Sequence, residues 1–339
     1  MKVLGGLMGD LGAVPERARQ LEAKGYDGAV SAEVSSDPFM PLLLAAEHTE
    51  RIGLMTSIAV AFARNPMTMA QVGHDLNAYS KGRAVVGLGS QIRPHITKRF
   101  SMEWSHPAAR MREFILAMRA VWDCWYQEEK LDFRGDFYQH TLMTPMFTPR
   151  NTEYGAPAVS LAAVGPLMTE VAGEVADGLI AHAFTTQRYL REVTLPALER
   201  GFAKSGRARA DFEITCPVFV VSGADEKSFE GSRRAVAQQV SFYGSTPAYR
   251  PVLEMHGWGE LQTELTRMSK QGLWVEMGGL ITDEILSEFA VIAEPDQVAG
   301  EIASRYGGFV DAWLGMVPGS DPERERQTLE TLRAIPSNA

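Results

Sequence analysis

The sequence predicts an α/β barrel, and three observations lead to this prediction. Short apolar runs alternate with helix-like segments in three successive rounds before position 83. The run from Arg83 to Ser90 is typical of a strand buried on both faces. The chain has 339 residues, which suffices for one barrel with insertions or for two ordinary domains. The alternation favours the barrel.

The three rounds can be placed by their start and stop signals. Pro15 suits the first turn of a helix and Gly25 ends it, while Asn65 followed by Pro66 begins another helix. No short-period repeat accompanies the rounds, so a solenoid is not expected. The expected strands cover 3–9, 28–33 and 52–62, and the expected helices cover 14–24, 41–51 and 67–79.

The strand from Arg83 to Ser90 carries the first candidate site. Gly87 and Gly89 remove side chains near its carboxyl end, where a flat ligand or another backbone can approach, and Ser90 adds a hydroxyl. The active sites of α/β barrels lie at this end of the strands. Alternatively, the glycines only relieve crowding inside the barrel. They are not a dinucleotide fingerprint, because Ile92 stands where a third glycine would be.

The segment after this strand is locally basic, although the chain as a whole is acidic. It can receive the phosphate or carboxylate groups of a ligand, or it is simply solvated. Residues 131–149 then suggest a hairpin-like excursion that covers the barrel mouth as a lid. The charged residues between 91 and 112 are Arg93, Lys98, Arg99, Arg110 and Arg112 against the single acid Glu103.

The second half of the chain resumes the alternation. Small residues from Ala162 to Pro166 precede a helix, so free backbone amides there can bind a phosphate, although many ordinary turns look alike. Residues 244–272 suggest a helical insertion, of which 243–250 and 256–258 can line a substrate channel or a subunit contact. The expected strands lie at 156–164, 178–184, 213–222 and 312–317, and the expected helices at 165–175, 186–204, 225–243 and 295–305, with a charged C-terminal helix from 320.

Two polar side chains fall at the ends of expected strands. Glu33 and His182 can serve the site, or they are a solvated carboxylate and a structural hydrogen-bonding histidine. No zinc, Walker, nucleophile-elbow or Cys-x-x-Cys motif is present, and the seven histidines are scattered, so we expect no metal site. A pocket of glycines, hydroxyls and amides suits a planar cofactor that brings its own reactivity.

Composition limits the partners of the chain. The net charge of −9 argues against nucleic acid and anionic membranes, each of which requires a basic face. No signal peptide and no apolar run long enough for a bilayer is visible, so we expect a cytoplasmic protein with a small-molecule substrate. Two distant cysteines, Cys124 and Cys216, suggest reduced thiols and no disulfide.

Several of these motifs together resemble the bacterial luciferase-like superfamily of flavin- and deazaflavin-dependent oxidoreductases. The resemblance covers nearly the whole chain. It includes Thr56-Ser57-Ile58, Asn65-Pro66, Ala70-Gln71, Gly82-Arg83 and Gly87-Leu88-Gly89-Ser90, and continues through Ala162 to Pro166 and Ala172 to Gly178. Arg93 to Ile96, Lys98 to Phe100 and Phe242 to Tyr249 are similar to an actinobacterial and mycobacterial subgroup assigned to coenzyme F420.

The resemblance implies a single TIM (β/α)8 barrel over 1–339, with lid insertions at about 127–152 and 244–290, commonly as a homodimer. It also implies a deazaflavin on the carboxyl face of the barrel, beside a non-proline cis peptide at Ser57–Ile58, with an acidic tail that basic residues receive. The implied cofactor residues are Thr56, Ser57, Ile58, Gly87, Gly89, Ser90 and Gln91 for the ring, Ala162, Ala163, Val164 and Gly165 for the phosphate, and Lys98 and Arg99 for the tail.

The chain departs from the sugar-phosphate dehydrogenases of this superfamily. Glu33-Val34 replaces their Asp-His pair, and Ile92 replaces a glutamate, so we expect a less polar substrate. Glu33, His95 or His182 is then the candidate proton relay. The leading hypothesis is an F420-dependent oxidoreductase that transfers a hydride; the alternatives are a reduced-FMN monooxygenase and a non-catalytic flavin-binding barrel.

Overall fold

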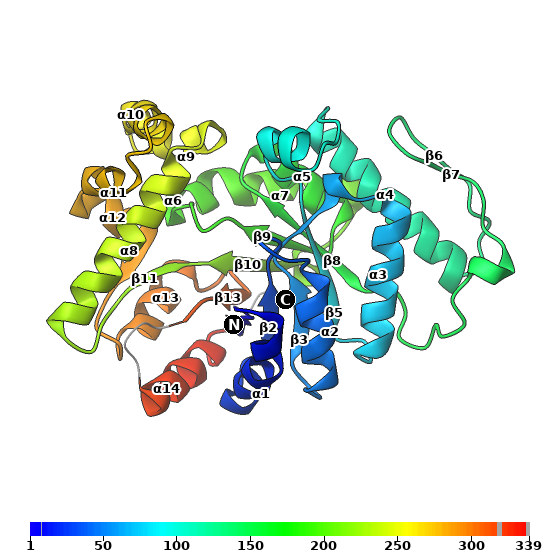
Figure 1. Cartoon of the computed structure of the whole chain (residues 1–339), viewed down its shortest axis with the longest axis horizontal. Coiled ribbons are helices and arrows are strands. Elements are labelled where there is room, and N and C mark those ends of the chain that lie inside the picture. Colours follow the sequence, from blue (N-terminus) through cyan, green and yellow to red (C-terminus); the bar gives the residue numbers. More distant parts are fainter. Residues whose placement is uncertain (8, 317–320, 337–339) are drawn as a thin grey trace.

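A closed parallel barrel forms the centre of the protein in a computed structural model that describes residues 1–7, 9–316 and 321–336 (Figure 1). The main sheet has nine strands, of which β4 (Ala59–Val60) continues the path of β3 after a break. The other eight close the barrel in chain order: β1 (Lys2–Gly6), β2 (Gly28–Ser31), β3 (Gly53–Thr56), β5 (Ala84–Gly89), β8 (Ala158–Ala163), β9 (Gly178–Ala181), β10 (Glu213–Pro217) and β13 (Ala312–Leu314).

The register shows how the sheet closes. Leu4 of β1 pairs with Gly28 on one side and with Leu314 on the other, and β3 pairs with β5 through Leu54 and Ala84. All of these pairings are parallel, as is expected when a helix crosses between consecutive strands. The predicted (β/α)8 barrel is confirmed.

Helices follow most strands and pack around the barrel. The expected helix at 14–24 has these bounds in the structure and ends at Gly25, whose φ of +90° favours glycine. Asn65 begins α3 in a capping box with Thr68, with Pro66 in the first turn. These outer helices are α1 (Val14–Lys24), α2 (Phe39–Glu47), α3 (Pro66–Tyr79), α4 (Pro107–Tyr126), α5 (Pro166–Val175), α6 (Gln187–Tyr189), α7 (Leu195–Ser205), α8 (Glu226–Gly244), α13 (Val298–Tyr306) and α14 (Pro322–Arg333).

Two expected strands are interrupted in the structure. The strand expected at 52–62 is split into β3 and β4 by a cis peptide bond between Ser57 and Ile58, the position that the resemblance implies. The strand expected at 213–222 is split because β11 (Phe219–Val221) leaves the barrel to pair with β12 (Ala290–Ile292). The expected first strand, 3–9, includes Met8, and the expected closing strand, 312–317, includes Val317; both of these residues lie outside the described residues.

The two expected insertions lie on opposite sides of the barrel in Figure 1. In the first, β6 (Phe133–Arg134) and β7 (Gln139–His140) form a hairpin, and the Glu113 carboxylate on α4 accepts the backbone amides of the hairpin turn at 136–138. The second contains α9 (Arg250–Met255), α10 (Gly259–Lys270), α11 (Trp274–Met277) and α12 (Asp283–Phe289).

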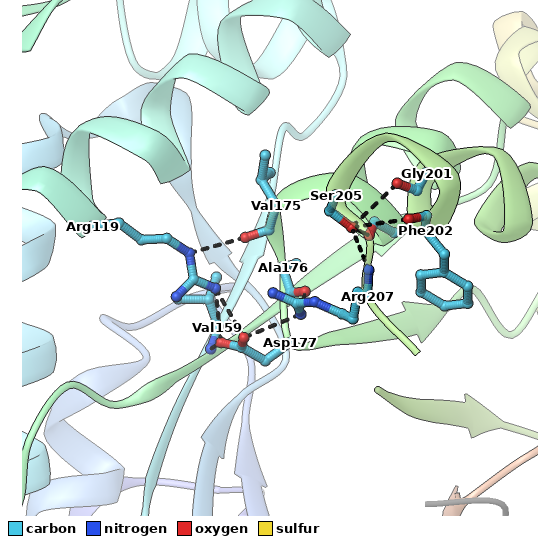
Figure 2. Close-up of polar contacts among 10 residues, drawn as sticks. Arg119, Val159, Val175, Ala176, Asp177, Gly201, Phe202, Ser205 and Arg207 are labelled. Carbon is cyan, nitrogen blue, oxygen red and sulfur yellow. Dashed lines mark hydrogen bonds and ion pairs between the residues drawn. The ribbon is translucent and has the colours of Figure 1, made fainter. Parts of the chain in front are cut away.

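Three aspartates connect neighbouring strands at the amino-terminal end of the barrel. Asp27, Asp177 and Asp311 each directly precede a barrel strand. Each carboxylate accepts a backbone amide from the neighbouring strand at 2.8 Å and also contacts an arginine. Figure 2 shows the second of these clamps, in which Asp177 lies between Arg119 and Arg207.

The hydrophobic core has two parts. A large cluster packs between the strands and the surrounding helices, and a small cluster of Leu4, Val30, Met55, Ile180 and Ala312 fills the inside of the barrel. Within residues 1–7, 9–316 and 321–336, none of the helices combines the length and apolarity that crossing a membrane requires.

Candidate functional site

A cavity of about 820 Å³ lies at the carboxyl ends of the barrel strands. Its wall is built from the residues that end or follow β3, β5, β8, β9 and β10 and from the end of α8 and the turn after it. This is the face where parallel barrels carry their active sites. The cavity is large enough for a cofactor or a drug-sized ligand.

Most of the residues predicted for the site lie together on this wall. The members come from four strand ends that are far apart in the sequence, so the barrel itself brings them together. They are Ser57, Ile58, Gly89, Ser90, Gln91, Ala162, Ala163, Val164, Gly165 and His182.

Thr56 and Gly87 lie below the cavity and not on its wall. The Thr56 hydroxyl donates to the Gly87 carbonyl at 2.7 Å and accepts the Gly87 amide at 2.9 Å. A Cβ on Gly87 would lie 1.8 Å from the Thr56 carbonyl oxygen. For Gly87 the alternative interpretation is therefore the right one: this glycine relieves crowding between two strands.

Gly89 makes room for a neighbouring side chain. A Cβ there would lie 2.8 Å from Cγ1 of Ile58, next to the cis peptide. Gly89 therefore lets the Ile58 side chain take its place on the cavity wall. The glycine acts on the shape of the cavity through Ile58.

The structure places Glu33 beside the cavity, where it stabilises the break between β3 and β4. Its amide donates to the Ile58 carbonyl at 3.2 Å, and its carboxylate accepts the Val60 amide at 2.8 Å. The same carboxylate, only 8% exposed, is paired with Arg64 at 2.5 Å, and Arg64 also contacts Asp37. These contacts give Glu33 a positioning role and leave it off the cavity wall.

The predicted basic cluster is not gathered at the cavity. His95, Lys98 and Arg99 belong to the short π-helix His95–Arg99, are exposed and are not among the lining residues, and Arg99 donates to the Val34 carbonyl at 2.6 Å. Arg112 pairs with Glu174. Arg110 donates to the Tyr138 hydroxyl. Arg93 is the one charged side chain of that segment on the wall among the described residues.

The turn before α5 offers free backbone donors. Val164 and Gly165 line the cavity, and the structure shows no backbone or side-chain acceptor for their amides among the described residues. A Cβ on Gly165 would meet nothing within 4 Å, so this side faces open space. The position precedes the first turn of a ten-residue helix, which favours an anion.

His182 is the one histidine on the wall among the described residues. Its Nδ1 accepts the backbone amide of Phe184 at 2.9 Å, and its ring packs at 4.6 Å between the rings of Tyr243 and Tyr249. Burial lowers the pKa of His182 to about 4 and raises the pKa of Tyr249 to about 12. Both side chains are therefore neutral at physiological pH.

Several wall residues were missed as site residues. Tyr243, Ala248 and Tyr249 lie in the segment that was expected to line a channel or a subunit contact, and the structure supports the channel. Nothing in the sequence indicated that Trp104 and Gln239 line the cavity. Trp104 lies on a loop and Gln239 on a helix, and their approach to the cavity depends on the whole fold. The expected lid at 131–149 contributes no described residue to the lining.

The wall offers a distinct set of chemical groups. Among the described residues it has hydroxyls, amides, one imidazole and one guanidinium, but no carboxylate and no thiol. In the described part of the chain no cluster of three or more histidine, cysteine, aspartate or glutamate side chains can hold a metal ion. The residues present fit a planar ligand with an anionic group, and they provide no nucleophile with its base.

Comparisons with known proteins agree with the observed fold. The model of the luciferase-like monooxygenase family matches residues 3–312. An uncharacterised protein of Mycobacterium tuberculosis is 53% identical over 98% of both chains. An F420-dependent glucose-6-phosphate dehydrogenase of Intrasporangium calvum is 26% identical, with 84% of this chain and 79% of the relative covered. The structure of a coenzyme F420-dependent tetrahydromethanopterin reductase of Methanopyrus kandleri superposes with a TM-score of 0.77 at 20% identity, covering 98% and 97% of the chains.

Proposed function

Since the chain belongs to the luciferase-like monooxygenase family, we propose that it is an oxidoreductase that uses coenzyme F420 to transfer a hydride to or from a small organic substrate. The observation that supports this most directly is the cavity at the carboxyl end of the barrel. Its wall has no carboxylate and no thiol among the described residues, which supports a reaction in which a bound cofactor supplies the reactive group.

The residues of the wall divide into parts that suit such a cofactor. Ile58 and Gly89 provide a flat apolar surface for a ring, and the amides of Val164 and Gly165 suit its phosphate. Arg93 stands at the exposed rim, where it suits an acidic tail. When bound, coenzyme F420 supplies a deazaflavin carbon that accepts or gives up a hydride.

A second candidate is a reduced-FMN monooxygenase. It is favoured by the family to which the chain belongs and by the many apolar residues on the wall, because oxygen chemistry on a flavin requires a dry pocket. F420 is preferred here because the relative from Intrasporangium calvum is named as F420-dependent and because FMN has no acidic tail for Arg93 to receive.

Equilibrium titration of the protein with F420 and with FMN, each in both redox states, tests the proposal. We expect F420 to bind at least tenfold more tightly than FMN. Tighter binding of FMN, with turnover that consumes oxygen, would overturn the F420 assignment and establish the monooxygenase.

A matched pair of variants tests the tail contact. Arg93→Gln should weaken F420 about two- to fivefold, as expected for an exposed ion pair, and should leave a tail-free deazaflavin unaffected. Lys98→Gln removes a charge of the same sign from a residue that does not line the cavity, so F420 affinity should stay within twofold. Equal losses for both variants would show that no specific contact exists.

A further inference from the structure

His182 presents a hydrogen-bond donor to the cavity. Its Nδ1 accepts the Phe184 amide at 2.9 Å, so the single proton of the neutral ring is on Nε2. Among the described residues no side chain or carbonyl accepts a hydrogen bond from Nε2, and this atom is not fully buried. Because His182 lines the cavity, Nε2–H is open to a ligand.

The orientation of the ring is fixed from two sides. Tyr243 packs against it nearly perpendicularly, at 86°, and Tyr249 covers it at 37°, both with ring centroids 4.6 Å away. Phe184, which supplies the amide to Nδ1, stacks in turn on Tyr249 and Phe289. A half-turn of the ring about its Cβ–Cγ bond would put Cδ2 in the place of Nδ1 and would break the hydrogen bond with the Phe184 amide.

The surroundings restrict what can accept this hydrogen bond. The wall has no carboxylate among the described residues, so no group there would balance the positive charge of a cationic ligand. The one guanidinium on the wall is that of Arg93, an exposed residue that follows β5, whereas His182 follows β9. Val218, Phe219 and Leu314 add apolar surface. The inner part of the cavity therefore suits an uncharged molecule with an apolar body.

We propose that the substrate is an uncharged carbonyl compound whose oxygen accepts the hydrogen bond from Nε2–H of His182. A carbonyl oxygen is an acceptor only, so it matches a group that can only donate. Because Nδ1 accepts the Phe184 amide and Nε2 is protonated, the neutral ring offers the ligand a hydrogen-bond donor and no acceptor. That this compound reacts rests on the proposed function, whereas its binding to the protein depends on the His182 side chain alone.

Long-range ¹H–¹⁵N spectra of the histidine-labelled protein test the first step. We expect His182 to show the Nε2–H form with no change between pH 6 and 9, since burial lowers its pKa to about 4 and raises the pKa of the facing Tyr249 hydroxyl to about 12. Tyr243 also packs against the ring, and Arg93 is the one charged side chain on the cavity wall among the described residues. A proton on Nδ1, or titration within this range, would overturn the proposal.

A pair of probes of equal shape tests the second step. Acetophenone has a carbonyl where α-methylstyrene has a CH₂ group, so we expect acetophenone to bind at least fivefold more tightly and to move the Nε2 resonance. His182→Phe keeps an aromatic ring and should abolish the preference. His95→Gln changes an exposed histidine that does not line the cavity and should retain it.

The outcomes separate this inference from the proposed function. The probes are measured in the free protein and in the cofactor complex. A carbonyl preference without F420 binding would contradict the proposed function and support the role of His182. Equal binding of both probes to the unmodified protein would overturn the role of His182. So would an Nε2 resonance that moves with F420 but not with acetophenone, because the donor would then serve the cofactor.

Discussion

Gly87 and Gly89 stand two positions apart on one strand and have different tasks. The space that Gly87 leaves is filled by the backbone of β3, with the Thr56 carbonyl oxygen 1.8 Å from the position of a Cβ. The space that Gly89 leaves is filled by the Ile58 side chain, with Cγ1 2.8 Å and Cδ1 2.9 Å from the position of a Cβ. A backbone carbonyl within a barrel is held by its strand, whereas a side chain such as that of Ile58 can be displaced.

The two glycines therefore respond differently to a methyl group. Gly87→Ala should destabilise the fold by about 3 kcal/mol or more, since overpacking against backbone forces a strand to shift. Gly89→Ala should cost less than about 1.5 kcal/mol but should displace Ile58 and weaken cofactor binding. Denaturant unfolding and cofactor titration measure the two effects. A folded, binding-competent Gly87→Ala protein would contradict this distinction.

The sequence located most of the wall but not the roles of single side chains. Ser90 was found because strand ends in a barrel converge on one face, Gly165 because it precedes a helix, and Ser57 through the resemblance to the superfamily. Glu33 looked like a candidate acid for the same reason, yet its partners Val60 and Arg64 follow a break that periodicity does not reveal. Whether a carboxylate at a strand end meets solvent, ligand or arginine depends on tertiary contacts.

At the scale of elements, the aspartate before β9 connects two strands, one helix and the loop that follows α7. Asp177 accepts the Val159 amide of β8 and contacts Arg119 of α4 and Arg207. Arg207 also donates to the Ala176 carbonyl. In Figure 2 these groups converge on one carboxylate. Asp177 precedes β9, whereas the cavity lies at the carboxyl ends of the strands. The role of this clamp is structural.

Asp177→Ala should lower the free energy of unfolding by about 2–3 kcal/mol, because one amide and two arginines lose a charged acceptor. Cofactor affinity of the folded protein should not change. Asp211→Ala, at an exposed aspartate nearby in the chain, serves as the control and should shift stability by less than about 0.5 kcal/mol. A change in affinity without a loss of stability would contradict the structural role.

Element positions could be predicted where local signals were strong. The helix at 14–24 was correct because Pro15 and Gly25 mark its ends. The expected strand at 52–62 was too long, because an apolar run does not show that Ser57–Ile58 is cis. The hairpin at 131–149 was found, but its place on α4 depends on Glu113, which lies outside the segment.

For the whole molecule, the barrel and the second insertion together make the cavity. The barrel supplies one wall from its strand ends, and Tyr243 and Tyr249 near the start of the insertion supply the opposite contacts to His182. The alternation of strands and helices could predict the barrel, whereas the aromatic enclosure depends on how a distant helix returns to it. The expected homodimer and the cytoplasmic location stay predictions, since neither follows from contacts within one chain.

The central claim is that a flat redox ring lies in the carboxyl-end mouth of this barrel. A crystal structure of the protein with F420 tests it most directly. The account predicts that the ring lies against Ile58 and Gly89 and that the phosphate accepts the amides of Val164 and Gly165. F420 bound at any other place, with the mouth of the barrel left unfilled, would contradict it.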